Sequence, residues 1–569
     1  MNEPTCSYNG KYMHSGTEHH IHCNRKPYKD GVCIIHLDKQ TVAQETEEEK
    51  HQIEVAFLDA LDKEIEFTKT APSQSVLYWN GAHFPALKLE NKTFPRKVLL
   101  SGATFEHGTS FNKCQFIGGF EAVKSKFLGI ERNIKFKECR FIGEANFWFA
   151  NFGKNPVLED CIFEEKVKFQ GCHLDTPDFS GNQFLAGVEF AMTTFYGNCD
   201  FKLCQFQTEA YFLSMMVDES AYFDFRNSIF TGRLNFGAHN EQDDLLCAGL
   251  DFHSVEVSEK SALDFQNMAV SSANFCQLLL SDGASLKFEN IGFGKGELCD
   301  IVQRDKTVIS FINTPLDNTT FLNTNIEKFN FINTKWTQID GRQGLISETN
   351  LRDKILLLPR DKKLSPDEQR SLVAEIEFNS ENYRQLVKNH EAKRNFSLAE
   401  NFHVGEMEMQ RQKGAIRGTK YLGLMRRLTS WNDFSVYKAL SKYGTNYLHS
   451  LNVLGGMILL LAFLFLLSGL TRTESITHSH LKDGAHKIQV SLLPCASNRL
   501  VKPAELIDDY VSSVLFTLSV ATLQKDTLYK TTTAPGEFLR IVTFLFVPSQ
   551  AAITLMAIRR RFRRGSGSE

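Results

Sequence analysis

Large apolar side chains recur at a spacing of five residues over much of the chain. One run passes without a break through Phe311, Leu316, Phe321, Ile326, Phe331 and Trp336. In another, steps of five and six alternate through Phe184, Phe190, Phe195, Phe201, Phe206 and Phe212. This spacing fits neither an α-helix, which repeats about every 3.6 residues, nor an ordinary strand, which alternates about every two. It predicts a coil in which each side takes up about five residues before the chain turns.

A second position in the pattern supports the coil. Two residues before the large apolar residue stands a small one, as at Ala103, Cys114, Cys139, Ala145, Ala150, Cys161, Cys172, Thr193, Cys199, Cys204, Ala210 and Ser228. A narrow solenoid needs one large and one small inward residue on each of its sides. The pattern resembles that of the pentapeptide-repeat family over residues 103–336. The resemblance implies a right-handed, four-sided (quadrilateral) β-helix, which we assign to residues 101–340.

The repeats contain most of the 13 cysteines of the chain. We interpret those in the small position as inert core residues, because free cysteine is often buried: Cys114, Cys139, Cys161, Cys172, Cys199 and Cys204. No charged-then-apolar leader opens the sequence, so we expect a cytoplasmic, reduced setting rather than a disulfide framework. Residues 237–251 break the spacing and predict a loop, and residues 292–306 are a second irregular stretch.

Four candidate metal ligands precede the repeats, within residues 1–40. They are Cys6, Cys23, Cys33 and His36. Two residues separate the last two of them, which places both side chains on one ion, and a segment this short needs a staple in place of a core. Three cysteines and one histidine suit a tetrahedral structural zinc and leave no open position for catalysis.

Two alternatives to this ligand set stay open. One of three nearby histidines can replace the second ligand: His19, His20 or His22. The segment can also be an unmetallated tail. A similar short Cys-x-x-His knuckle heads many bacterial pentapeptide-repeat proteins, so the resemblance extends to this end of the chain.

Helical patterns flank the repeats on both sides. Residues 41–100 form an acidic linker and a cap for the β-helix, with a helix predicted over 41–66. Residues 360–445 form a helical connector, in which Ser365 and Ser397 precede capping sequences. A one-sided stripe then predicts an interfacial helix, the alternative being a soluble amphipathic helix: Trp431, Phe434, Tyr437 and Leu440.

Residues 446–564 predict a membrane domain. Residues 451–470 and 541–558 carry no charge and are long enough to span the hydrocarbon layer. The basic cluster that follows the second span places the C-terminus in the cytoplasm, and two spans place the N-terminus there as well. We therefore expect a multi-pass protein of the cell inner membrane. Residues 565–569 resemble a tag remnant.

Residues 511–523 lie between the two spans and carry no charge. They are too few to cross a bilayer, so we predict a re-entrant segment. This order of segments, in which a short apolar helix lies between two spans, resembles the two-helix pore-loop channels. The candidate pore residues are Thr517, Ser519, Thr522, Gln524, Lys525 and Asp526. No glycine follows this run, which argues against a potassium filter, and Lys525 would set a positive charge at the pore mouth.

These features favour an oligomeric ion channel, a tetramer being one arrangement, with the repeat rod as sensor or docking surface for an unknown protein or ligand. The alternative is a membrane-tethered scaffold with a non-conducting pore loop. We find no phosphate-binding loop, nucleophile elbow or paired-carboxylate motif, so we expect no enzyme. The formal net charge is −3 and lysine alternates with glutamate along the repeats, so no nucleic-acid partner is expected.

Overall fold

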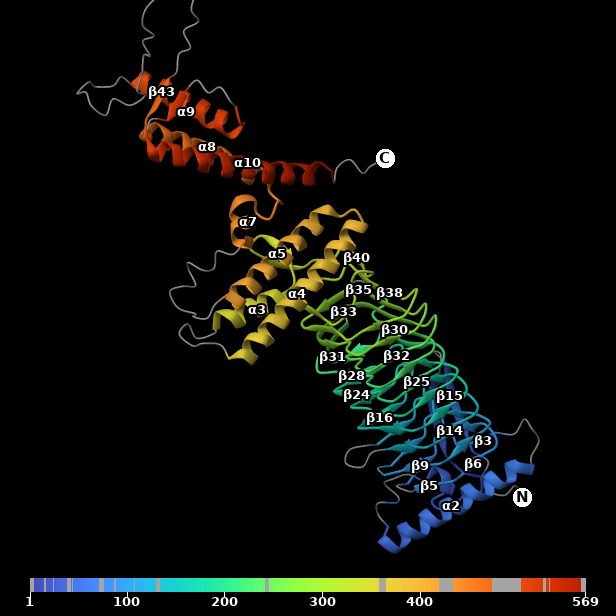
Figure 1. Ribbon diagram of the computed structural model, residues 1–569. Coiled ribbons are helices and arrows are strands. Elements are labelled where there is room, and N and C mark those ends of the chain that lie inside the picture. Colours follow the sequence, from blue (N-terminus) through green and yellow to red (C-terminus); the bar gives the residue numbers. More distant parts are fainter. Residues whose placement is uncertain are drawn as a thin grey trace, which may run out of the picture. The chain divides into compact units, whose positions relative to one another are not determined.

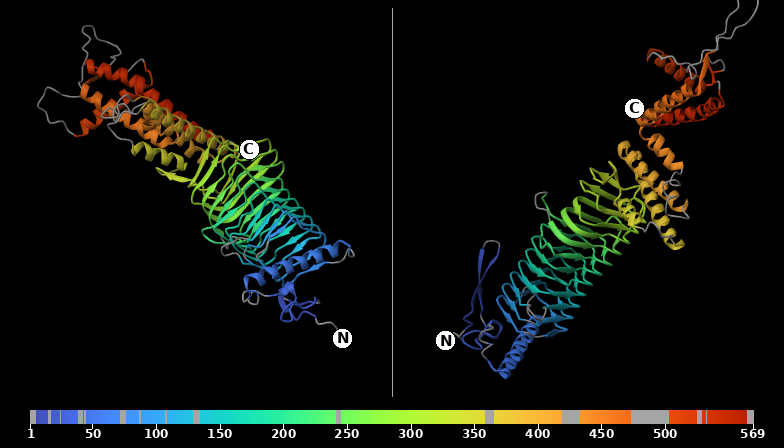
Figure 2. Two further views of the ribbon diagram at one scale, coloured as in Figure 1. Left: turned by 90° about the horizontal axis from the view of Figure 1, so that it is seen from below. Right: turned by 90° about the vertical axis from the view of Figure 1, so that its left-hand side faces the viewer.

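The computed structural model divides into two compact units, residues 1–352 and 353–569. It describes residues 5–563 except for 15–16, 24, 38–41, 43–44, 71–75, 86–87, 107, 129–133, 241–244, 358–364, 419–432, 473–502, 525–528 and 532. The first unit opens with the hairpin β1 (Asn9–His14) and β2 (Thr17–His22) and the short helix η1 (Ile34–His36). Figure 2 shows this hairpin at the N-terminal end of the unit.

Four rows of strands follow in the first unit. The first row contains β3 (Leu77–Tyr78), β7 (Val98–Leu99), β11 (Phe120–Glu121), β15 (Ala145–Asn146), β19 (Val167–Lys168), β22 (Val188–Glu189), β26 (Ala210–Leu213), β30 (Arg233–Gly237), β33 (Ala262–Asn274), β35 (Ser285–Phe293), β38 (Val308–Ile312) and β40 (Asn330–Ile332). The second contains β4 (His83–Phe84), β8 (Thr104–Phe105), β12 (Lys126–Phe127), β16 (Asn151–Lys154), β20 (His173–Asp175), β23 (Thr194–Tyr196) and β27 (Met216–Val217).

The other two rows complete each turn. The third contains β5 (Lys88–Glu90), β9 (Ser110–Asn112), β13 (Lys135–Lys137), β17 (Val157–Glu159), β24 (Asn198–Asp200), β28 (Tyr222–Asp224), β31 (Leu245–Asp251), β36 (Gly296–Cys299) and β39 (Thr319–Leu322). The fourth contains β6 (Thr93–Phe94), β10 (Gln115–Phe116), β14 (Arg140–Phe141), β18 (Ile162–Phe163), β21 (Gln183–Phe184), β25 (Gln205–Phe206), β29 (Ile229–Phe230), β32 (Glu256–Val257), β34 (Leu279–Leu280) and β37 (Val302–Gln303).

Parallel pairing of each strand with its counterpart one turn later builds a β-solenoid over residues 77–332. The pairs β3–β7, β4–β8, β5–β9 and β6–β10 stack the second turn on the first. About 11 such turns follow one another (Figure 1). The predicted repeat fold, with up to four strands in a turn, is therefore present.

The large and small positions point inward as the spacing predicts. In the fourth row the rings of Phe94, Phe116, Phe141 and Phe163 stack at centroid distances of 4.7 Å. Cys114 Sγ donates to the Leu89 carbonyl at 3.4 Å, and the other small-position cysteines make similar bonds. Burial raises the pKa of Cys172 and of Cys204, so these thiols stay protonated.

The corners of the coil use left-handed backbone. Asn313, Asn323 and Asn333, the third residues of the words Phe-Ile-Asn-Thr and Phe-Leu-Asn-Thr, have φ values of 49°, 46° and 51°. Asparagine tolerates this conformation better than most residues with a side chain. Asn333 Nδ2 also donates to Asn313 Oδ1 at 2.8 Å, which links corners of successive turns.

The predicted loop and the second irregular stretch both contain strands, so the loop prediction is partly wrong. Within residues 237–251, β31 forms a strand from Leu245 to Asp251, and 292–306 contains β36 and β37. The strands β31, β33 and β35 are long because each continues around a corner from one row into the next. In the first stretch Leu245 and Cys247 are buried in place of phenylalanine, so the spacing signal disappears while the coil continues.

Caps close both ends of the solenoid. Helix α2 (Glu47–Thr70) packs Phe57 on Phe84 of the first turn, with ring centroids 5.3 Å apart. At the other end stand the hairpin β41 (Thr337–Ile339) and β42 (Arg342–Gly344) and helix α3 (Ile346–Leu357). There the buried Arg342 pairs with the buried Glu348 at 2.6 Å. Covered ends keep open strand edges from pairing with other chains.

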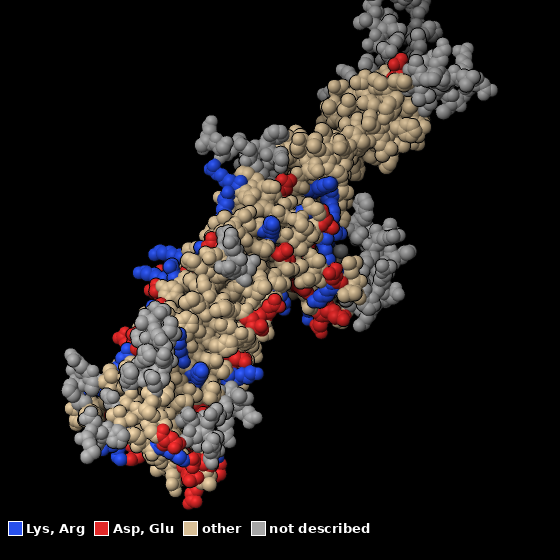
Figure 3. All heavy atoms as spheres, turned by 180° about the vertical axis from the view of Figure 1, so that it is seen from behind, with Lys and Arg blue, Asp and Glu red and all other residues tan. Residues whose placement is uncertain are grey.

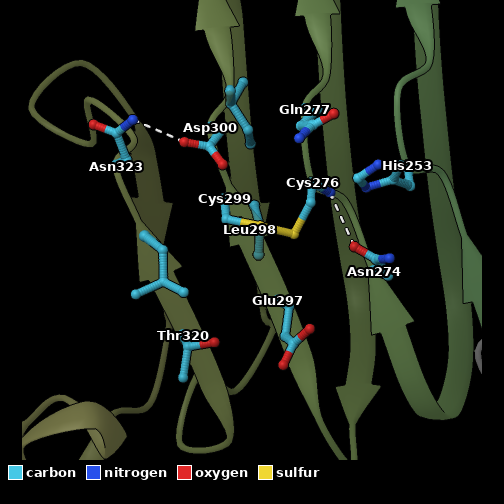
Figure 4. Close-up of a disulfide and its surroundings, with 12 residues drawn as sticks. His253, Asn274, Cys276, Gln277, Glu297, Leu298, Cys299, Asp300, Thr320 and Asn323 are labelled. Atoms are coloured by element: carbon cyan, nitrogen blue, oxygen red, sulfur yellow. Dashed lines mark hydrogen bonds between the residues drawn. A yellow bond between two sulfur atoms is a disulfide. The ribbon is translucent and has the colours of Figure 1, made fainter.

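One disulfide differs from the expected reduced state. Cys276 and Cys299 are bonded on neighbouring turns, with Cα atoms 4.4 Å apart (Figure 4). The pairing of Asn274 with Glu297 sets their register, and the Cys276 amide donates to Asn274 Oδ1 at 3.1 Å. The other described cysteines are free and buried.

Reduction of this disulfide should loosen the last turns of the solenoid. Because the bond closes a loop of about 20 residues, its loss should lower the local free energy of unfolding by about 3 kcal/mol. Hydrogen exchange of β36 and β39, measured with and without a dithiol reductant, tests this. The Cys276→Ser variant is the control, and a response of that variant to the reductant would contradict the assignment.

The second unit is helical. It contains α4 (Pro366–Ala392), α5 (Phe396–Gly418), α7 (Asp433–Ser441), α8 (Tyr447–Ser468), α9 (Pro503–Ala521) and α10 (Ala534–Arg563), with the hairpin β43 (Leu470–Arg472) and β44 (Tyr529–Thr531). Ser365 and Glu368 form the predicted capping box at the start of α4. The predicted cap of the next helix is wrong, because Asn395 Oδ1 accepts the Leu398 amide at 3.3 Å and α5 begins before Ser397.

Two helices of this unit are long and apolar enough to cross a membrane. Tyr447–Ser468 and Ala534–Arg559 have mean hydropathies of 2.4 and 2.0. The first ends at Ser468 because Gly469 turns the chain with φ 86°. In the view of Figure 3, the surface of this pair carries almost no charged side chain, whereas lysine, arginine, aspartate and glutamate are scattered over the solenoid. Trp431, part of the predicted interfacial stripe, lies outside the described residues.

Candidate metal centre and membrane unit

Three short segments bring the four predicted ligands together. The Cys6 amide donates to the Arg25 carbonyl at 2.8 Å, and the Ser7 amide donates to the Gly31 carbonyl at 2.8 Å. Gly31 turns the chain with φ 78°, a conformation that glycine adopts without a side-chain clash. Cys33 then precedes η1, whose single turn brings His36 back over it.

The ligand atoms have the spacing of a tetrahedral metal site. The Sγ atoms of Cys23 and Cys33 lie 3.6 Å apart, and His36 Nδ1 lies 3.4 Å from Cys33 Sγ and 3.7 Å from Cys6 Sγ. Zinc bonds of about 2.3 Å to sulfur and about 2.0 Å to nitrogen would separate ligand atoms by about 3.5–3.8 Å. All four residues are buried, and their ligand atoms lie within 4.8 Å of one another. The group can therefore bind a metal ion such as zinc.

A second layer of contacts orients the histidine. His36 Nε2 donates to the Asn80 carbonyl at 2.9 Å in the tautomer that leaves Nδ1 free to face the sulfur atoms. The ring also stacks on Tyr8, with centroids 4.1 Å apart. Such partners fix the ring and the tautomer of a metal-bound histidine.

The sequence analysis did not predict the role of Arg25. Its guanidinium donates to Cys23 Sγ at 3.6 Å, to both oxygens of Glu64 at 2.6 and 2.9 Å, and to the Tyr78 carbonyl at 2.7 Å. Glu64 also accepts the Trp79 indole at 2.6 Å. Arg25 thereby connects the candidate metal centre to α2 and to the first turn of the solenoid through hydrogen bonds. The one sequence signal was a cation two residues after a candidate ligand, and no sequence signal pointed to Glu64.

The two neighbouring thiols differ in their protonation. A hydrogen bond from Cys33 lowers the pKa of Cys23 to about 3, which makes Cys23 a thiolate at neutral pH. The same hydrogen bond, together with burial, raises the pKa of Cys33, which keeps its proton. Because metal ligands must be deprotonated, metal binding would release the Cys33 proton.

The structure describes four of the candidate pore residues in the second unit, and these four have different surroundings. Thr517 is buried and donates to the Ser513 carbonyl at 2.8 Å, and Ser519 is half-buried and donates to the Phe516 carbonyl at 2.8 Å. Thr522 and Gln524 are exposed at the end of α9. Lys525 and Asp526 lie outside the described residues.

Helix α9 packs against the second half of α8 and the first half of α10. Phe516 and Val520 join a core with Phe465, Leu466 and Leu470 near the end of α8. The Tyr510 hydroxyl donates to the Leu459 carbonyl at 3.0 Å. The end of α9, at Leu523 and Gln524, lines a pocket with Ile541 and Phe544 from the first half of α10.

A buried polar cluster joins the other half of the pair. Ser450 Oγ lies 2.9 Å from Thr554 Oγ1, and Gln550 Nε2 donates to Ser450 Oγ at 3.1 Å and to its carbonyl at 3.2 Å. Interhelical hydrogen bonds of this kind hold membrane helices together where burial of apolar surface gives no driving force. The sequence analysis did not predict this cluster.

Comparisons with protein-family models, with curated proteins and with solved structures return no match for this chain. What can be said of the protein therefore rests on its own sequence and structure. The chain combines a β-solenoid, an N-terminal cluster of three cysteines and one histidine, and two long apolar helices.

Proposed function

We propose that the protein is an oligomeric, channel-like membrane protein whose solenoid, of the pentapeptide-repeat type with right-handed coils, acts as a sensor or docking rod. The packing of α9 carries the proposal. Helix α9 lies beside an antiparallel pair of membrane-length helices, and it shares an apolar core with Phe465, Leu466 and Leu470 at the end of α8. A segment that enters a membrane part-way persists only when protein covers it or when it lines water.

Exposed apolar surface on the three helices supports assembly in a bilayer. Leu460, Leu515 and Phe546 are 59%, 58% and 58% exposed in the single chain. Lipid and neighbouring copies of the chain would cover such surface, and a tetramer would surround an axis with α9. The basic residues from Arg559 onward favour a cytoplasmic C-terminus at the inner membrane, with the N-terminus on the same side.

The end of α9 argues against a potassium filter. Leu523 has φ 59°, and the Gln524 amide donates back to the Ser519 carbonyl at 3.1 Å. This closes the helix end with its own hydrogen bond and does not direct that carbonyl toward an ion. We therefore propose a non-selective or anion-favouring path, with Thr522 and Gln524 near the ion and Lys525 and Asp526 at the mouth.

Recordings from purified protein in planar bilayers test this proposal. Under asymmetric KCl, Lys525→Glu should move the reversal potential toward cation preference, because it inverts a ring of charge. Lys530→Glu on β44 is the matched control for charge. A current with an unchanged reversal potential in Lys525→Glu would remove Lys525 from the path.

A membrane-tethered scaffold is the second candidate. The hydroxyls of Thr517, Ser519 and Thr522 all donate to carbonyls of their own helix, which favours a pore loop that does not conduct. In that case an unknown protein or ligand would bind the solenoid, and the metal would be a structural zinc. No current in any solution, with the protein folded and inserted, would favour the scaffold over the channel.

A further inference from the structure

The connection between α7 and α8 is a bend made of left-handed backbone. Lys442, Tyr443 and Gly444 have φ values of 47°, 62° and 72°. Glycine adopts such angles freely, but residues with a side chain do so at a cost in free energy. Two such residues in succession persist only where surrounding contacts hold them.

A buried carboxylate on α5 holds the bend from one side. Tyr443 is buried, and its hydroxyl donates to Glu408 Oε1 at 3.0 Å. Glu408 is 2% exposed and also pairs with Lys438 of α7 at 2.6 Å and with Arg411 of α5 at 2.9 Å. Burial together with these cations gives the contact a strong preference for one geometry.

Contacts from α8 and α10, the two long apolar helices (the membrane pair), hold the bend from the other side. Gln550 Nε2 on α10 donates to the Leu440 carbonyl at 3.0 Å, and His449 Nε2 on α8 lies 3.0 Å from the Ala439 carbonyl. Asn446 Oδ1 accepts the His449 amide at 2.9 Å and so starts α8 as a separate helix. The bend thus joins the α4–α5 hairpin to the membrane pair through α7.

We propose that residues 442–446 form a conformational switch, bent while Tyr443 is held by Glu408 and straight, as one continuous helix over 433–468, when that contact opens. The segment contains no proline, so nothing in its covalent structure prevents helical hydrogen bonds. Straightening would relieve the left-handed residues and would form backbone bonds in place of the side-chain contacts. A partner that shifts α5 relative to α7 would therefore reorient α8.

Hydrogen exchange of the full-length protein in lipid nanodiscs tests the switch. Tyr443→Phe removes one hydroxyl and keeps the ring, so exchange of the amides of 443–446 should become about fivefold slower as they enter a helix. Adding Lys442→Gly, which accommodates φ 47° and weakens the helix, should restore wild-type exchange. Tyr529→Phe, the same chemical change on β44, removes a hydroxyl that donates to Ser512 Oγ at 3.0 Å, so it is the matched control and should leave exchange of 443–446 unchanged.

The outcomes separate a switch from a merely loosened structure. Faster or unchanged exchange in Tyr443→Phe, or a double variant that is not restored, would overturn the proposal. A second arm rests on the proposed channel: Tyr443→Phe should change the open fraction of single channels at least about threefold and leave unit conductance unchanged. A wild-type protein without current would refute the channel, while the exchange data would still decide on the switch.

Discussion

Removal of the metal is expected to release residues 5–37 from the solenoid and to leave the turns folded. Among the side chains of this segment that the structure describes, the buried aliphatic ones are Ile35 and Leu37, so we expect the bonds to the metal to supply most of its stability. Structural zinc contributes about 10–16 kcal/mol in small zinc modules, far more than any other single interaction of this segment. Arg25 belongs to the released segment, so its hydrogen bonds to Glu64 of α2 would weaken as well.

Metal analysis and limited proteolysis measure this expectation. Protein purified without chelator should contain about one zinc per chain, and EDTA or Cys33→Ser should remove it and expose the N-terminal segment to protease. His20→Ala is the matched control, because His20 on β2 is one of the alternative ligands and its loss should leave the zinc in place if Cys6, Cys23, Cys33 and His36 are the ligands. Zinc-free wild-type protein would refute the site, and zinc loss in His20→Ala would point to the alternative ligand set.

A cavity in the phenylalanine core is the second large effect. Phe195→Ala should lower the free energy of unfolding by about 3–5 kcal/mol, since removing a fully buried aromatic side chain leaves space that neighbours fill only in part. Phe195 is 0% exposed, and its ring contacts Phe190 and Phe223 at centroid distances of 5.6 and 5.2 Å. These neighbours lie on the same and the following turns, so local relaxation is limited.

Phe149→Ala provides the matched control for this cavity. Phe149 is 45% exposed at a corner of the coil, so the same chemical change should cost no more than about 0.5–1 kcal/mol. Chemical denaturation followed by circular dichroism measures both variants. Equal losses in the two variants would show that the inward and outward positions are not distinct in solution.

The five-residue spacing determined most of the solenoid. A coil with a narrow interior accepts one large and one small side chain on each side, so the residues that repeat are those that point inward. The four metal ligands were predicted by another local argument, because the segment that carries them is too short to build a core. Where leucine or cysteine filled the inward positions, as at Leu245 and Cys247, the signal weakened and a strand was predicted as part of a loop.

Long-range geometry decided the rest. Arg25 and Glu64 are 39 positions apart and meet only because α2 folds across the first turn. Cys276 and Cys299 bond because strand register aligns neighbouring turns, and Ser450 meets Thr554 because α8 and α10 run side by side. A sequence determines which side chains point inward through a local period, whereas partners across turns or helices depend on register and packing, which no local pattern contains.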